Sequence, residues 1–127
     1  MPVETADVAG LARAVKALSD PVRLKMVGLL AEGRGRCELP DLCTRNVPGE
    51  GTPVGLCVCE LQEQFGLGQS RTSYHLRILR EAGLVTEEVR GKWTFYELDH
   101  EAVATTLRAL QDLAGARHPS RGDHRER

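Results

Sequence analysis

The segment 58–98 constrains the fold more than any other part of this 127-residue chain. Apolar residues at helical spacing predict a short helix from Val58 to Phe65, and the glycines of 66–68 end it. A second helix follows, with Ser70 as its expected N-cap and Gly83 as its expected stop. Two short helices joined by a glycine-containing turn are typical of a helix-turn-helix, although an ordinary helical hairpin has the same pattern.

The residues after Gly83 separate these two interpretations. "LVTEEVRGKWTFYELD" alternates apolar and polar residues on both sides of Arg90-Gly91-Lys92, which predicts a β-hairpin with glycine at its tip. A helix-turn-helix followed by a hairpin with a basic tip is the pattern of a winged helix. We therefore expect a mainly α fold with one β-hairpin, of the α+β class.

Three further helices are expected around this unit. An apolar stripe predicts the first helix, and a second begins after the N-cap Asp20, with Pro21 at its first position, and ends at Gly33. The last helix follows the cap Asp99. The stripes of the first and last helices form a candidate dimer surface, although packing into the core is equally economical. They comprise Val8, Leu11, Val15 and Leu18, and Val103, Leu107, Leu110 and Leu113.

The length predicts a single domain, which we place at residues 5–114. Within it, the stretch 33–56 has no sustained period and reads as a long loop insertion that carries Cys37 and Cys43. The polar residues 115–127 are expected to form a disordered tail.

The composition indicates a soluble globular protein, and without an export signal we expect it in the cytoplasm. No apolar run approaches the ~20 residues of a membrane helix, so no membrane partner is expected. The acidic N-terminus lacks the basic region of a signal peptide. Cytosolic thiols stay reduced, which favours ligand or redox roles for the four cysteines over structural disulfides.

Binding to double-stranded DNA requires a local basic patch, because the formal net charge of the chain is only -1. Residues at the start of the second helix of the pair can reach base edges in the DNA groove. Basic residues further along the chain are expected to contact phosphates. For any one Lys or Arg taken alone, the alternative is an ordinary surface charge in contact with solvent. His75 is either a backbone contact or a packed polar residue. The base-edge candidates are Gln69, Ser70, Arg71, Ser73 and Tyr74, and the phosphate candidates are Arg77, Arg80, Arg90 and Lys92.

Three stretches together resemble the ArsR/SmtB family of metal-responsive winged helix repressors: "ALSDPVRLKMVGLLAEG", "CVCELQEQFGLGQSRTSYHLRILREAGLV" and "RGKWTFYEL". The resemblance covers roughly Val8 to Leu113, apart from the loop. It implies a homodimer through the first and last helices, an operator with two half-sites, and release from DNA when an inducer binds. It also implies a protein that is not an enzyme and needs no organic cofactor.

"CVCEL" resembles the "CVCDL" metal box of the arsenic-responsive members, which implies that Cys57 and Cys59 bind trivalent arsenic or antimony. Soft thiolates suit such ions, and the partial positive charge of a helix N-terminus is expected to lower a thiol pKa. Residues two apart point away from each other on a regular helix, so the two thiols converge best where the backbone is extended or distorts on binding.

The sequence departs from this pattern at Gln62, where many arsenic sensors carry a third cysteine. Trivalent arsenic prefers three sulfurs, so the third comes from an exogenous thiol or from the loop. Our hypothesis is a site of Cys57, Cys59 and either Cys37 or Cys43, and the choice between the two loop cysteines stays open.

Other readings use the same residues. Four cysteines also suit Cd²⁺, Pb²⁺ or Zn²⁺, and the same DNA-binding unit with cysteine pairs that form disulfides would be a redox-sensing repressor. A zinc-stabilised interaction domain predicts that chelators unfold the protein. The carboxylate and histidine site found on the last helix of other family members fits poorly, because no further histidine follows Asp99 and His100 within that helix. An enzyme is the weakest option, since the chain has no phosphate loop.

Overall fold

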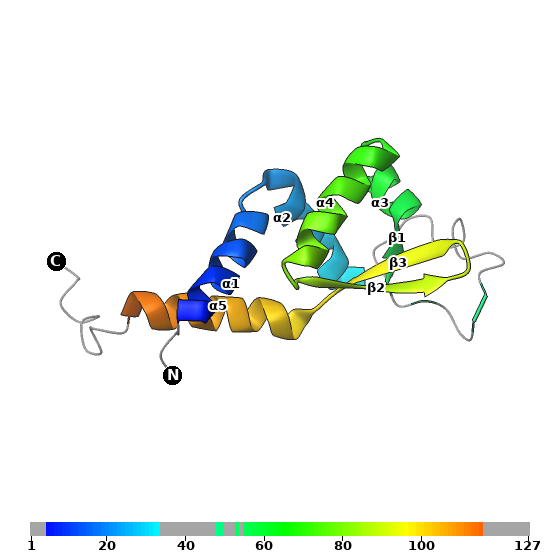
Figure 1. Cartoon of the computed structure of the whole chain (residues 1–127). Coiled ribbons are helices and arrows are strands. Elements are labelled where there is room, and N and C mark those ends of the chain that lie inside the picture. Colours follow the sequence, from blue (N-terminus) through cyan, green and yellow to red (C-terminus); the bar gives the residue numbers. More distant parts are fainter. Residues whose placement is uncertain (1–4, 34–47, 50–52, 54, 116–127) are drawn as a thin grey trace.

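The computed structural model describes residues 5–33, 48–49, 53 and 55–115. Most of the loop insertion, including Cys37 and Cys43, and the tail from residue 116 lie outside the described residues. The mainly α fold with a β-hairpin is confirmed (Figure 1). Its elements are α1 (Thr5–Ala17), α2 (Pro21–Glu32), β1 (Leu56–Cys57), α3 (Val58–Phe65), α4 (Gln69–Glu81), β2 (Val85–Arg90), β3 (Trp93–Leu98) and α5 (His100–Gly115).

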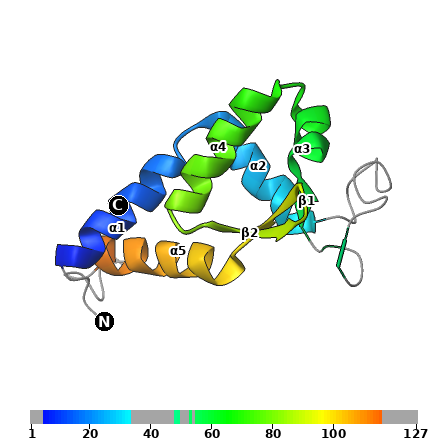
Figure 2. The ribbon, with the colours of Figure 1, turned by 45° about the vertical axis from the view of Figure 1, so that its right-hand side comes forward.

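The elements form an elongated molecule in which α1 and α5 lie together at one end and the hairpin projects at the other (Figures 1 and 2). Helix α4 lies between these ends, and it packs against α2, α3 and β2. The helix-turn-helix pair and the hairpin are therefore neighbours in space as well as in sequence.

Helix boundaries largely follow the capping residues. Asp20 caps α2, because its Oδ1 accepts hydrogen bonds from the N–H groups of Val22 (2.8 Å) and Arg23 (3.3 Å). Pro21 is the first residue of α2, and Gly33 follows its end with a φ of 71°. At α5, the Oδ1 of Asp99 accepts from Ala102 N–H at 3.0 Å. These four predictions, for Asp20, Pro21, Gly33 and Asp99, are confirmed.

The expectation that Ser70 caps α4 is wrong. Gly68 is the N-cap, with extended backbone, and α4 begins at Gln69. The Gly68 carbonyl accepts from both the N–H (3.0 Å) and the Oγ1 hydroxyl (2.9 Å) of Thr72, and Thr72 is fully buried. Burial of Thr72 thus places the N-cap two residues before Ser70.

The sheet has a third strand that the sequence did not suggest. Strand β3 lies between β2 and β1, and both pairings are antiparallel. In β1, Leu56 pairs with Tyr96 and Cys57 pairs with Phe95. Gly55 permits this approach, because a Cβ at that position would collide with the Tyr96 backbone. The strand ties the residues just before α3 to the hairpin.

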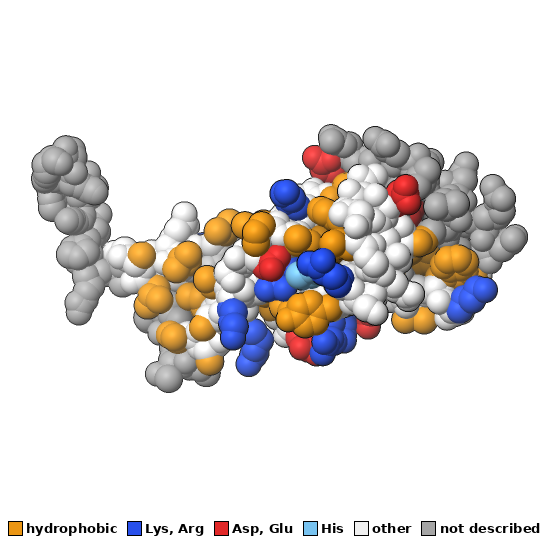
Figure 3. Space-filling view, turned by 90° about the horizontal axis from the view of Figure 1, so that it is seen from above, with side chains coloured by type: hydrophobic (Ala, Val, Ile, Leu, Met, Phe, Trp, Pro, Cys, Tyr) orange, Lys and Arg blue, Asp and Glu red, His pale blue; other side chains and the backbone are white. Residues whose placement is uncertain are grey.

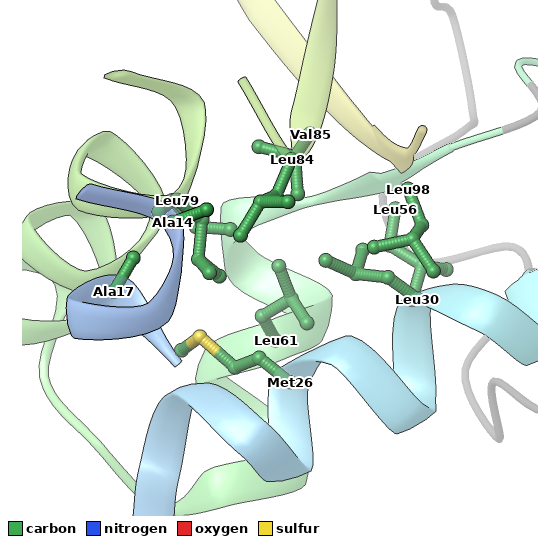
Figure 4. Packing of buried hydrophobic residues seen from close by; sticks show 11 residues of the cluster. Ala14, Ala17, Met26, Leu30, Leu56, Leu61, Leu79, Leu84, Val85 and Leu98 are labelled. Atoms are coloured by element: carbon green, nitrogen blue, oxygen red, sulfur yellow. The ribbon is translucent and has the colours of Figure 1, made fainter. Parts of the chain in front are cut away.

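The main core joins the end of α1, through Ala14 and Ala17, to α2, α3, α4 and the sheet (Figure 4). Met26, Leu61, Leu76 and Leu79 are completely buried there. The two apolar stripes at the other end are covered only in part, since α5 has no buried residue. Large apolar side chains remain exposed on both of those helices: Val8, Val15, Leu107, Leu110 and Leu113. Within one subunit, therefore, core packing accounts for only part of these stripes, namely Leu11, Leu18 and Val103.

Candidate thiol site and nucleic-acid interface

Cys57 and Cys59 lie where β1 passes into α3. Cys57 ends the strand and is the N-cap of the helix, with φ -89° and ψ 168°. It forms a small buried cluster with Phe95, and Cys59 and Trp93 pack against that cluster. The extended backbone at Cys57 is the condition under which two cysteines separated by one residue can face a common space.

Glu60 completes the local structure around Cys57. Its Oε1 accepts a hydrogen bond from the Cys57 N–H at 2.8 Å, and the Cys57 sulfur faces the N–H of Glu60 in return. This is a capping box in which a thiol takes the usual place of a hydroxyl. Glu60 is 1% exposed, so a carboxyl group lies buried directly beside the thiol. The sequence analysis missed Glu60, although an acid three residues after an N-cap is the signal of this motif.

Burial raises the pKa of the Cys57 thiol to about 11. The charge of Glu60 acts in the same direction, while the backbone N–H groups of Glu60 and Cys59 oppose it. The expectation that the helix N-terminus lowers the thiol pKa is therefore wrong for Cys57. Desolvation of a side chain that is only 2% exposed outweighs the partial charge of the helix end.

Cys59 differs from Cys57 in its bonding. Cys57 is a free thiol, whereas Cys59 is disulfide-bonded. Nowhere in the described part of the chain do three His, Cys, Asp or Glu side chains gather closely enough to hold a metal ion. The described residues thus contain two cysteine sulfurs at this place, and a site of three sulfurs would need one more from elsewhere.

The start of α4 presents the side chains expected to meet DNA. Gln69, Ser70 and Arg71 are exposed, Ser73 is half-buried, and Tyr74 is 49% exposed. Further along, the Arg77 guanidinium lies 5.7 Å from the centre of the Tyr74 ring. Seen from above, Lys and Arg side chains intermingle with exposed apolar ones on this side of the molecule (Figure 3).

The basic residues of the hairpin are not equally available. Arg90 Nε lies 2.7 Å from Glu88 Oε2, its side chain is 13% exposed, and it packs closely over Gly49. Lys92 is exposed at the turn, with its Nζ 5.7 Å from the centre of the Trp93 ring. Lys92 therefore presents its charge more openly than Arg90 does.

His75 lies inside the protein although it belongs to the same helix. It is 5% exposed, and its Nδ1 lies 2.9 Å from Nη1 of Arg23 in α2. This geometry favours the packed polar role over contact with the DNA backbone. Arg23 did not feature in the sequence analysis, because nothing in the local sequence signals a partner 52 residues away.

A helix-turn-helix with an exposed polar and basic second helix, followed by a β-hairpin with a basic tip, defines a winged helix DNA-binding protein. Comparison with known proteins gives the family. The model of the family described as "Bacterial regulatory protein, arsR family" matches residues 55–87.

Two relatives from Bacillus subtilis (strain 168) extend the match beyond these residues. The arsenical resistance operon repressor is 38% identical over 88 residues, which are 69% of this chain and 65% of that protein. The uncharacterized HTH-type transcriptional regulator YbzH is 36% identical over 91 residues, 69% of this chain and 82% of that protein. The chain therefore belongs to the ArsR family of bacterial regulatory proteins.

A solved structure agrees with the fold. The homodimeric winged helix-turn-helix DNA-binding domain of Mb0332 from Mycobacterium bovis, a possible ArsR-family transcriptional regulator, superposes with a TM-score of 0.58 at 25% identity. The match covers 91% of this chain and 86% of that chain. Among the described residues, no helix is long and apolar enough to cross a membrane.

Proposed function

We propose that this protein is a transcriptional repressor that binds operator DNA as a homodimer and leaves it when trivalent arsenic or antimony binds Cys57 and Cys59. The observation that carries this proposal is the packing of both cysteines into one cluster at the start of α3. The next helix, α4, is the second helix of the helix-turn-helix, and we call it the recognition helix. Relatives named arsenical resistance operon repressors support the assignment of the inducer.

The protonated state of Cys57 is compatible with arsenite chemistry. Arsenite is As(OH)₃ near neutral pH, and each As–S bond forms as a thiol proton leaves with one hydroxide as water. A divalent ion must instead expel the proton of a thiol whose pKa is about 11, so its binding strengthens as pH rises. The raised pKa thus favours arsenite over Cd²⁺, Pb²⁺ or Zn²⁺ at neutral pH.

The third sulfur remains part of the proposal. Cys37 and Cys43 lie outside the described residues, and we propose that one of them completes the site. The disulfide-bonded state of Cys59 supports this, because such a bond requires a second sulfur within reach of Cys59. An exogenous thiol is the alternative donor.

Two connections lead from the thiols to the DNA-binding surface. Helix α3 packs against the recognition helix α4, so a change at the start of α3 can move both. Cys57 also pairs with Phe95 of β3, whose strand leads back to the hairpin tip at Lys92. A ligand that changes the extended conformation of Cys57 therefore shifts both α4 and the β2–β3 hairpin. Typical coupling of two sites is ~1–3 kcal/mol, or about 5–150-fold in affinity.

The exposed apolar face of α1 and α5 supports the homodimer. Leu107, Leu110 and Leu113 are 43–57% exposed within a single subunit, and Val8 and Val15 are each 41% exposed. A contiguous apolar surface of this kind marks an interface with another protein. The homodimeric relative from Mycobacterium bovis supports a second copy of the chain as its occupant.

The decisive experiment is fluorescence anisotropy with labelled operator DNA under reducing conditions. Arsenite, antimonite, Cd²⁺, Pb²⁺ and Zn²⁺ are titrated into wild type, the double variant Cys57→Ser/Cys59→Ser, and the double variant Cys37→Ser/Cys43→Ser. We expect arsenite and antimonite to release wild type and to fail with the first variant. An unchanged response of the second variant would refute a ligand from the loop. Release by none of these ions would refute metal and metalloid sensing.

A thiol redox repressor is the second candidate, because the structure places Cys59 in a disulfide and leaves Cys57 as a free thiol next to it. Its test uses no metal. DNA affinity is measured in dithiothreitol and after mild peroxide treatment, with Cys59→Ser as the control. Loss of affinity on oxidation in wild type alone would favour this function over the first.

A further inference from the structure

A part-buried polar contact joins α2 to α4. Arg23, in the first turn of α2, donates from Nη1 to Nδ1 of His75 in α4 at 2.9 Å. Its Nε donates to the Ala17 carbonyl at the end of α1 at 2.6 Å. One guanidinium thus joins three helices at the point where α4 meets the rest of the protein.

This contact determines the protonation state of His75. A guanidinium has only donors, so Nδ1 must be the acceptor and the ring must be neutral, with its proton on Nε2. Protonation of Nδ1 would remove the acceptor and place a positive imidazolium against the positive guanidinium. The contact therefore exists only while His75 is uncharged.

The charged groups around His75 come from both helices. From α2, Arg23 disfavours protonation and Asp20, the N-cap, favours it; within α4, Arg71 disfavours it, and the Tyr74 ring stacks edge-on at 5.4 Å. Burial lowers the pKa of His75, and the two arginines act with burial against Asp20. Because the folded-state pKa lies below the ordinary value, the neutral form is stable at neutral pH and is lost only in acid.

We propose that Arg23 and His75 are a positioning pair for the recognition helix, and that operator binding requires His75 to be neutral. Arg71, one of the exposed residues at the start of α4, lies one helical turn before His75, so the pair sits next to the candidate base-contacting residues. When His75 is protonated, the repulsion from Arg23 shifts α4 on its support, and the base-contacting residues move with it. The inference rests on DNA binding by α4, and it is independent of the identity of the inducer.

This role predicts a pH dependence opposite to that of a phosphate contact. A histidine that touched the DNA backbone would bind phosphate better when protonated, so acid would strengthen binding. A neutral acceptor for Arg23 predicts weaker binding in acid, by up to about tenfold for each pH unit below the pKa of His75. The sign of the effect therefore separates the two roles of His75.

The test is operator affinity at constant salt from about pH 7.5 to about pH 5.5, the interval that spans the ordinary histidine pKa. Circular dichroism at each pH verifies that the protein stays folded. We expect wild type to lose affinity towards acid. His75→Asn places an amide oxygen near the position of Nδ1 and does not titrate, so it should bind DNA at neutral pH and show a flat profile.

Two further variants complete the design. Arg23→Met removes the cation, so the loss of affinity in acid should disappear although binding is weaker throughout. His100→Asn removes an exposed histidine at the start of α5 and should keep the wild-type profile. A flat or rising wild-type profile, or an acid loss that persists in His75→Asn, overturns the positioning role. Absence of DNA binding at every pH overturns both this inference and the proposed repressor function.

Discussion

The thiol of Cys57 should react far more slowly in the folded protein than in the unfolded chain. Its pKa rises from 9.0 to about 11 on folding, chiefly by burial. At neutral pH both values lie above the pH, so the thiolate fraction falls by about two powers of ten, or roughly 100-fold. The thiolate is the reactive form, so alkylation should slow by at least about this factor.

The assay is alkylation with iodoacetamide at neutral pH in a phosphine reductant, followed by mass spectrometry of the peptide that contains Cys57. The same reaction in denaturing urea gives the unfolded rate. Glu60→Gln removes the charge that adds to the raised pKa, so its folded-state rate should lie between the folded and unfolded rates of wild type. Glu63→Gln, at an exposed position of the same helix, should react like wild type.

Alkylation of folded wild type within a few-fold of the unfolded rate would refute the reasoning, because burial would then not protect the thiol. A rate in Glu60→Gln equal to that of wild type would refute only the contribution of the carboxylate. Either result would also weaken the argument that the raised pKa favours arsenite over divalent ions.

Three further predictions concern packing and assembly. Leu76→Ala deletes a completely buried side chain of the recognition helix and should lower the free energy of unfolding by about 2–5 kcal/mol in urea titrations; a loss below about 1 kcal/mol would contradict this packing. Gly55→Ala should lower the thermal midpoint, because the new Cβ collides with the Tyr96 backbone and opens the β1–β3 pairing; an unchanged midpoint would speak against that close approach. Leu110→Glu should convert a dimer to a monomer in analytical ultracentrifugation, whereas Thr105→Glu, an exposed polar position on the same helix, should remain dimeric; a dimeric Leu110→Glu would place the interface elsewhere.

The features that could be predicted from the sequence depend on neighbouring residues. Asp20 and Pro21 start α2 because a short acceptor and a fixed φ act within one helical turn. The hairpin follows from alternation around Gly91, and the structure pairs Arg90 with Trp93 across the turn. The thiol site could also be predicted from the sequence, because the residues that identify Cys57 and Cys59 as a ligand pair are their immediate neighbours.

The sequence predictions were wrong or incomplete where contacts with a distant segment determine the local secondary structure. The N-cap of α4 is Gly68 instead of Ser70, because Thr72 is buried and its hydroxyl donates to the Gly68 carbonyl. Strand β1 has only two residues and exists because β3 offers it a free edge. A two-residue strand carries no periodicity of its own, so no pattern could reveal it.

By itself, the sequence determined the family, the order of the helices and hairpin, and the chemistry of Cys57 and Cys59 as soft donors. The tertiary structure decided the protonation behaviour of two side chains, Cys57 and His75. Burial against Phe95 and Glu60 raises the pKa of Cys57, where the helix end alone predicted a lower value. Contact with Arg23 makes His75 a neutral acceptor inside the protein. Both outcomes depend on solvent exclusion and on charges brought from distant parts of the chain, which only the folded arrangement specifies.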